Sequence, residues 1–133
     1  RLLRSRTSIP LAAGQAWGYA WQNLHFMEAR ALDIVQTDIV NVGGFTEGIK
    51  TAHLAQTFDL PLASHGWPAM NMHLIAATSA GYRVEYHASQ EELEKAIFVN
   101  PPKPEKGWVT CTAKPGLGLE LNEDALEKYR DRA

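Results

Sequence analysis

Short apolar runs alternate along this chain with longer segments in which apolar residues recur every three or four positions. The short runs are bounded by glycine, proline or polar residues, a pattern typical of strands. They cover residues 9–13, 33–37, 60–64 and 82–86. Between them, the spacing predicts a helix over 17–30 and a second helix from Thr46, its capping residue, to about Phe58. A third helix is expected from Pro68 to just before Gly81. Strands that alternate with helices in this way indicate a parallel sheet.

The alternation stops after the fourth strand, and the remaining elements are predicted from local signals. Ser89 and Glu92 have the spacing of a capping box, which predicts one short helix there. Residues 108–112 have the composition of a short strand. Asn122 is expected to cap a last helix, whose charged residues continue through Arg132.

Four polar residues follow the four predicted strands, one at the end of each. They are Gln15, Asp38, His65 and Glu85, separated by 23, 27 and 20 residues. Each interval is about the length of one strand and one helix. Side chains at the carboxyl ends of parallel strands converge on one face, which is where barrel enzymes carry out their chemistry. The pattern therefore predicts part of a (β/α) barrel that carries part of an active site.

The length of the chain limits this barrel to a half. The chain has 133 residues, whereas a complete eightfold (β/α) barrel needs roughly 200 or more. We therefore predict an α/β fold, a partial (half) TIM barrel of about four βα units over residues 1–112, followed by a C-terminal extension over 113–133 that holds the terminal helix. A half barrel has two open edge strands and an uncovered apolar face. We expect either a homo-oligomer that forms through the open edges or a fragment of a longer protein.

Composition narrows the classes of function and of compartment. The formal net charge is −2, and the three arginines among the first six residues have no aromatic residues between them, so we expect no nucleic-acid partner. No apolar run approaches the roughly 20 residues of a membrane helix, so no membrane partner is expected either. The single Cys111 excludes an intrachain disulfide and fits a reducing compartment, which predicts a cytoplasmic protein.

Several segments of the chain, taken in order, resemble the barrel motifs of one enzyme family, the mandelate racemase and muconate lactonizing enzyme branch of the enolase superfamily. These segments are 9–15, 33–38, 42–48, 61–67, 84–85 and 115–122. The resemblance implies that the four predicted strands correspond to strands five to eight of the family's TIM barrel. The last segment resembles the family's C-terminal segment, which returns toward its capping domain.

The resemblance also implies a chemistry. Members of this family bind one Mg²⁺ and remove the proton next to a carboxylate, and their reactions include racemisation, dehydration and cycloisomerisation. By this resemblance His65 would be the general acid or base, and Asp38 would hydrogen-bond it and fix its tautomer. Glu85 would bind the carboxylate of a sugar acid or another small carboxylate as it becomes an enolate. Gln15 stands where the family has its third metal-binding carboxylate.

These residue types suit the reaction. A proton next to a carboxylate is weakly acidic, so the site must also stabilise the charge that develops on the carboxylate oxygens. Histidine titrates near neutral pH, which suits a group that exchanges protons with a substrate. A carboxylic acid near the enolate can donate a hydrogen bond if its environment keeps it protonated.

The chain departs from the family pattern in two ways. The amide of Gln15 carries no charge, so Mg²⁺, which prefers anionic oxygen ligands, would bind weakly there or not at all. The family's second catalytic base, a lysine in a Lys-x-Lys motif, and its two earlier metal carboxylates have no counterpart in this sequence. The chain alone therefore holds at most one side of the reaction, and whether it acts as an enzyme stays open.

Three hypotheses remain. The chain is the C-terminal half barrel of a truncated dehydratase or racemase, with dehydration preferred because a histidine can also protonate the leaving hydroxyl. Alternatively, it is a non-catalytic half barrel that dimerises and binds a small carboxylate. The third hypothesis is a half enzyme, a lyase or isomerase, that a separate N-terminal half makes active.

Overall fold

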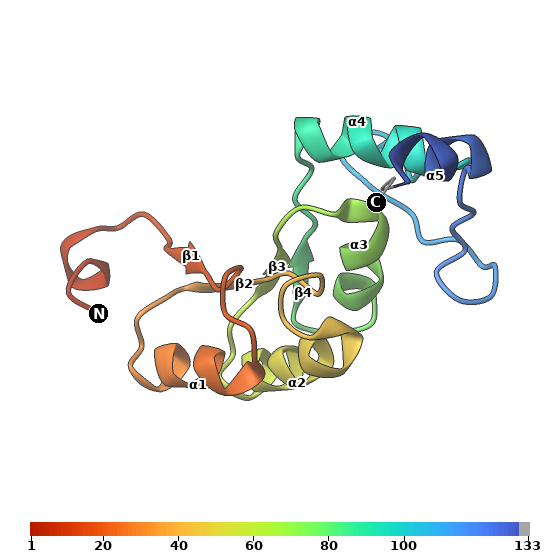
Figure 1. Ribbon diagram of the computed structural model, residues 1–133. Coiled ribbons are helices and arrows are strands. Elements are labelled where there is room, and N and C mark those ends of the chain that lie inside the picture. Colours follow the sequence, from red (N-terminus) through yellow and green to blue (C-terminus); the bar gives the residue numbers. More distant parts are fainter. Residues whose placement is uncertain (131–133) are drawn as a thin grey trace.

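Four parallel strands form one sheet, and their order across the sheet is their order along the chain (Figure 1). The computed structural model describes residues 1–130. The strands are β1 (Ala12–Ala13), β2 (Ile34–Thr37), β3 (Leu62–Ser64) and β4 (Gly81–Arg83). The register pairs Ala13 with Val35 and Thr37 with Ser64, so the carboxyl ends of β2 and β3 lie level with each other. This arrangement confirms the predicted parallel sheet.

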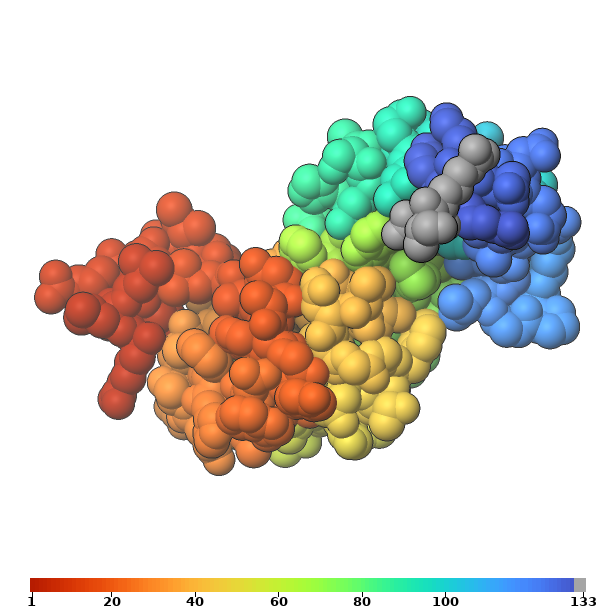
Figure 2. Space-filling model, viewed as in Figure 1, coloured from red at the N-terminus to blue at the C-terminus, as the bar shows by residue number. Residues whose placement is uncertain are grey.

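Helices connect the strands and continue beyond the last one. They are α1 (Ala20–Glu28), α2 (Gly44–Thr57), α3 (Pro68–Ala76), α4 (Ala88–Ile97) and α5 (Glu123–Tyr129), and a short 3-10 helix, η1 (Arg4–Arg6), precedes β1. Helices α1 and α2 pack against each other on one side of the sheet, while α4 and α5 lie together at the opposite end of the molecule from η1 (Figure 1). The space-filling view shows the first residues projecting away from the rest of the chain (Figure 2).

The core lies between the sheet and the helices. Val35 of β2 and Leu62 of β3 are fully buried, and they form one cluster with Met27, Ala52 and Leu74 from the three helices. Removal of these side chains from water is the main force that holds the helices on the sheet. Successive residues of β2 alternate between half-buried and buried, so only one face of this strand is fully covered. The fold is thus an α/β half barrel in which β2 is fully covered on one face and half-covered on the other.

Three predicted helix starts are wrong. The first helix begins at Ala20 instead of residue 17. The second helix begins at Gly44 instead of Thr46, because Gly43 takes a left-handed conformation, with φ of 79°, that turns the chain into the helix earlier. The fourth helix begins at Ala88 with His87 as its capping residue, and no side chain caps it, so the predicted capping box of Ser89 does not form.

Other predictions for the C-terminal part had different outcomes. Asn122 caps α5 as predicted, because its side-chain oxygen accepts hydrogen bonds from the backbone N–H groups of Asp124 and Ala125. The predicted strand over 108–112 is wrong. Within the described residues, this segment has one isolated bridge, from Trp108 to Glu105. The predicted continuation of charge through Arg132 lies outside the described residues, and the division between 1–112 and 113–133 stays a prediction.

No helix among residues 1–130 is both long enough and apolar enough to cross a membrane.

Candidate functional site

The carboxyl ends of β2 and β3 place Asp38 beside His65. Each residue directly follows its strand, and the backbone N–H of His65 donates to the carbonyl of Thr37 at 2.9 Å, which extends the strand pairing to this point. The imidazole Nδ1 of His65 faces the carboxylate Oδ2 of Asp38 at 3.4 Å. This distance is longer than that of a strong hydrogen bond, but the two groups are in position to share a proton.

The Asp38 carboxylate is completely buried, and donors surround it. Its Oδ1 accepts from the backbone N–H of Val40 and from the side-chain amide of Asn71, both at 3.0 Å. Its Oδ2 accepts from the side-chain amide of Asn41, also at 3.0 Å. A buried charge is tolerated when hydrogen bonds replace its water shell. Three donors besides the contact with His65 therefore hold the Asp38 carboxylate in place.

His65 is partly open to solvent, unlike its partner. Its side chain is 31% exposed while that of Asp38 is 0% exposed. With Nδ1 turned toward the buried carboxylate, Nε2 is the ring nitrogen available to a substrate. The ring of His87 lies nearby, with 6.5 Å between the two ring centroids. The arrangement gives a histidine that a buried carboxylate orients and that solvent can reach.

Glu85 contacts the turn that follows His65. The side-chain Oε2 of Glu85 accepts from the backbone N–H of Gly66 at 2.9 Å. The backbone N–H of Glu85 donates to the hydroxyl of Ser64 at 3.2 Å. Gly66 has φ of +53°, and a Cβ there would meet the side-chain oxygen of Gln90 at 2.0 Å, so another residue would strain the turn and displace Gln90. Glu85 is thus held next to the candidate histidine by the backbone of its turn.

Two further side chains hold the same turn. Gln90 accepts from the backbone N–H of Trp67 at 2.8 Å, and Glu94 accepts from that of Ala69 at 3.1 Å. These N–H groups belong to the start of α3, where helical backbone donors have no partner within the helix. Burial raises the pKa of the Glu94 carboxyl, while its bond from Ala69 acts in the opposite direction. The segment from β4 to α4 therefore fixes the loop that carries His65.

Gln15 stands apart from this hydrogen-bonded group. It follows β1 after Gly14, whose φ of +138° and close approach to the carbonyl of Gln36 leave no room for a side chain. No group of three or more histidine, cysteine, aspartate or glutamate residues that could hold a metal ion occurs among residues 1–130. A single neutral amide is a poor substitute for the anionic oxygens that Mg²⁺ prefers. The residues that the structure describes therefore do not make up a Mg²⁺ site by themselves.

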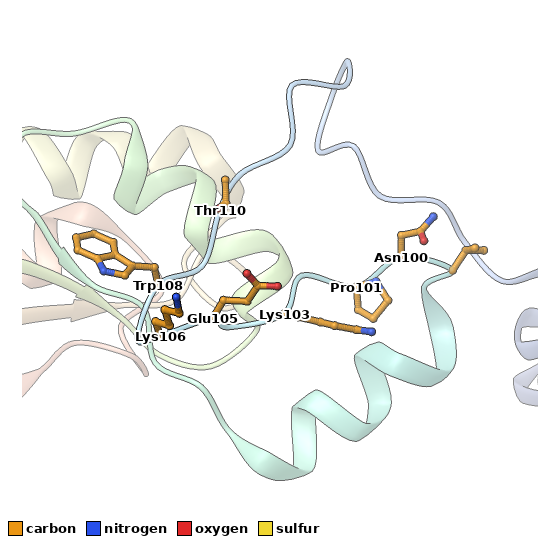
Figure 3. Close-up of a pocket in the computed structure, with 8 residues that line it drawn as sticks. Asn100, Pro101, Lys103, Glu105, Lys106, Trp108 and Thr110 are labelled. Atoms are coloured by element: carbon orange, nitrogen blue, oxygen red, sulfur yellow. The ribbon is translucent and has the colours of Figure 1, made fainter.

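One hollow of the molecule lies away from these residues. A pocket of about 650 Å³ is formed by the loop after α4, and none of the four candidate residues lines it (Figure 3). Its walls include Lys103, Lys106 and the ring of Trp108, which is 78% exposed. Its shape alone therefore gives no reason to move the candidate site away from the carboxyl ends of the strands.

Sequence reasoning did not identify Asn71, Gln90 or Glu94 as parts of this site. Asn71 offered a weak signal, because it is a polar residue within the apolar stretch of the third helix, six positions after His65. Gln90 and Glu94 lie on a polar helix, where such residues are ordinarily exposed. Only the folded arrangement shows that they accept hydrogen bonds from α3.

Comparison with known proteins places the chain in a family. The family described as "Enolase C-terminal domain-like" matches residues 1–125. The chain belongs to this family, which confirms the resemblance seen in the sequence.

Individual relatives show the range of activities in the family. The chain is 29% identical to the arabinonate dehydratase of Saccharolobus solfataricus, over 96% of this chain and 35% of that protein. It is 30% identical to the D-galactarolactone cycloisomerase of Agrobacterium fabrum, over 96% of this chain and 37% of that protein. Among solved structures, the L-talarate dehydratase of a Polaromonas species, complexed with Mg and L-glucarate, is 28% identical with a TM-score of 0.85, covering 98% of this chain and 34% of that one.

The chain thus spans about a third of the length of the relatives it matches. Its four parallel strands and their helices correspond to one part of much longer barrel structures. Activities, substrates and metal ions recorded for those proteins belong to the whole enzymes, and for this chain they are matters for proposal.

Proposed function

We propose that this chain supplies one side of the active site of an acid-sugar dehydratase, the side on which a histidine moves protons. The catalytic lysine and the metal-binding carboxylates would come from a separate segment of protein. The observation that carries this proposal is the pair formed by His65 and the buried Asp38 at the carboxyl ends of neighbouring strands. Glu85, two residues after β4, accepts a hydrogen bond from the turn directly after His65.

The roles of these residues follow from the reaction. In the dehydration of a sugar acid, the proton next to the carboxylate and the hydroxyl on the adjacent carbon leave together as water. His65 exchanges a proton through Nε2, either removing the acidic proton or protonating the departing hydroxyl oxygen. Asp38 keeps the ring in position by accepting from Nδ1, and it stabilises the imidazolium that forms when Nε2 is protonated.

Glu85 would bind the substrate carboxylate. Its Oε2 accepts from the backbone N–H of Gly66, which leaves Oε1 to face the substrate. In reactions of this class, a carboxylic acid can donate a hydrogen bond to the oxygens on which negative charge develops. Mg²⁺ supplies further charge stabilisation in such reactions when several carboxylates hold it. Since the described residues do not make up that site, the metal would have to bind to the complementary segment.

The test is reconstitution. The chain is mixed with the part of the arabinonate dehydratase that it does not match, and sugar acids are followed in D₂O for exchange of the acidic proton and for loss of water. We expect no exchange with the chain alone and Mg²⁺-dependent dehydration with the mixture.

Replacement of His65 by asparagine should lower the restored rate at least about 100-fold. Replacement of His53, an exposed histidine of α2, by asparagine is the matched control and should leave it unchanged. Proton exchange by the chain alone, or no activity in any mixture, would contradict the proposal.

Gln15 favours a second candidate function, a non-catalytic half barrel that forms a dimer and binds a small carboxylate. A neutral amide in place of a metal-binding carboxylate removes charge from the position where the family binds Mg²⁺. This candidate predicts that the chain alone binds a sugar acid equally well with Mg²⁺ and with a chelator present, as measured by calorimetry. Binding that requires Mg²⁺ would exclude it.

A further inference from the structure

Asn71 occupies an unusual place in α3. It is 0% exposed, and Ala69, Met72 and Leu74 of the same helix are buried as well. A buried amide without partners destabilises a protein, so a residue of this kind is expected to have all its hydrogen bonds made. The partners of Asn71 therefore indicate why a polar residue stands at this position.

All of these partners belong to the candidate site. The amide oxygen of Asn71 accepts from the backbone N–H of Ile39 at 3.1 Å. Its amide nitrogen donates to Oδ1 of Asp38 at 3.0 Å and to the carbonyls of Gly66 at 3.1 Å and His65 at 3.3 Å. A backbone N–H can only donate, so the oxygen must face Ile39 and the nitrogen must face Asp38. The orientation of the amide is thereby fixed by its surroundings.

We propose that Asn71 is a positioning residue, which sets the orientation of the Asp38 carboxylate and the tautomer of His65. This inference rests on the proposed function of the His65–Asp38 pair. By holding Oδ1, Asn71 leaves Oδ2 turned toward the imidazole. By holding the carbonyls of His65 and Gly66, the same amide fixes the backbone from which the ring extends.

Two substitutions of similar size show what these contacts require. A leucine at this position has a similar size, but it leaves the N–H of Ile39 without this acceptor and Oδ1 of Asp38 with only the N–H of Val40. An aspartate places a second carboxylate against Asp38 and against two carbonyl oxygens, which repels all three. The contacts need one donor end and one acceptor end on a short stem, which is what asparagine provides.

The test reads the position of the proton on His65 directly, without substrate or metal. The chain is labelled with ¹⁵N in its five histidines, and the signals of His65 are identified by their loss in the His65→Asn variant. At about pH 8.5, above the usual titration range of histidine, the shifts of the two ring nitrogens show which one carries the proton. We expect Nδ1 to carry it in the unsubstituted chain, by roughly tenfold over Nε2. A proton on Nε2 would overturn the proposal before any variant is made.

Two variants separate positioning from support of the loop. Asn71→Leu should lower the preference for a proton on Nδ1 by about fivefold or more. Gln90→Ala loosens the same turn at Trp67 but has no contact with Asp38, so it should leave the preference unchanged. Equal effects of the two variants would show that Asn71 acts only through the loop, which would overturn the proposal.

A control variant tests whether the loss of any buried amide would change the proton position on His65. Asn23 of α1 is also 0% exposed, but its side-chain oxygen and nitrogen have no hydrogen-bond partner among residues 1–130. Asn23→Leu should leave the proton of His65 on Nδ1. If Asn71→Leu does not fold, Asn71→Ser is measured in its place with the same expectation. The NMR experiment does not measure a reaction, so failure of the reconstitution experiment would not change its result. In the same way, a proton on Nε2 would overturn the role of Asn71, while the dehydratase proposal is decided by the reconstitution experiment.

Discussion

Glu94 carries a carboxylate into the interior of the protein. The residue is 1% exposed, and its Oε1 accepts from the backbone N–H of Ala69 at the start of α3. Burial raises the pKa of this carboxyl, the bond from Ala69 lowers it by a smaller amount, and the charge of Glu91 raises it further. The folded protein therefore binds this proton more readily than the unfolded chain does. The resulting stability is fully present below the unfolded pKa, roughly 4.3, and is lost as the pH rises through the folded pKa.

We predict that Glu94→Gln does not destabilise the protein at pH 7. Glutamine keeps an oxygen for the N–H of Ala69 but removes the buried charge, so the variant should be equal in stability or up to about 1 kcal/mol more stable. Urea unfolding from pH 4.5 to pH 8 measures this, and the variant should lose less stability across the range. Glu120→Gln, at an exposed glutamate, is the control and should follow the unsubstituted chain. A clear loss of stability at pH 7 would contradict the predicted role of burial.

Gly14 permits the chain to leave β1 close to β2. Its φ is +138°, and an added Cβ would lie 2.5 Å from the carbonyl oxygen of Gln36. Both the strained backbone and the steric clash are expected to destabilise a substituted protein. Gly14→Ala should therefore lower the free energy of unfolding by about 2 kcal/mol or more. Gly18→Ala is the matched control, since a Cβ there meets nothing closer than 3.8 Å. Equal stability of the two variants in urea would refute the steric argument.

Helix α5 depends on one capping residue. The side-chain oxygen of Asn122 accepts from the N–H groups of Asp124 and Ala125, and the helix has only seven residues. A helix of this length has little stability of its own, so loss of the cap should open it. Asn122→Ala should cost about 1 kcal/mol locally and speed amide hydrogen exchange in α5. Asn100→Ala, at an exposed loop position, should not change exchange in α5. Unchanged protection in the Asn122 variant would show that packing alone holds the helix.

The elements that sequence periodicity predicted well are those with a strong pattern. The parallel sheet and the helix that begins at Pro68 follow from apolar spacing and from proline at a helix start. The start of α2 could not be placed, because Thr46 is a good capping residue by chemistry while Gly43 enters the left-handed region by geometry. The strand over 108–112 was wrong because strand-like composition cannot show whether a partner strand lies beside it.

In the candidate site too, some residues could be predicted from local sequence and others only from the folded chain. Asp38 and His65 were predicted because both directly follow apolar runs, and the folded chain brings them within 3.4 Å. The side chains that hold them come from α3 and α4, at sequence distances that no periodic pattern records. Local sequence therefore indicates which groups stand at the strand ends, while their orientation depends on contacts between distant elements.

As a whole molecule, the half barrel leaves its sheet open at both edges. The strands β1 and β4 each have one neighbour, and all three residues of β4 are exposed. Large apolar side chains lie at or beside these edges, with Tyr82 51% exposed and Ile9 71% exposed. Unpaired strand edges with apolar side chains are templates for pairing with another chain. A second protein surface, from another copy or from a complementary segment, is thus expected to cover them.

We predict that the isolated chain self-associates through these edges. Light scattering after gel filtration should give a mass that rises with concentration toward at least twice the 14.8 kDa of one chain. Tyr82→Lys places a charge on the edge strand β4 and should weaken association about tenfold or more, because an edge lysine opposes pairing. Tyr129→Lys, on α5, is the matched control, since Tyr129 is exposed to a similar extent, 57% against 51%. A mass of one chain at every concentration, together with a cooperative melt, would show that the open edges are stable without a partner.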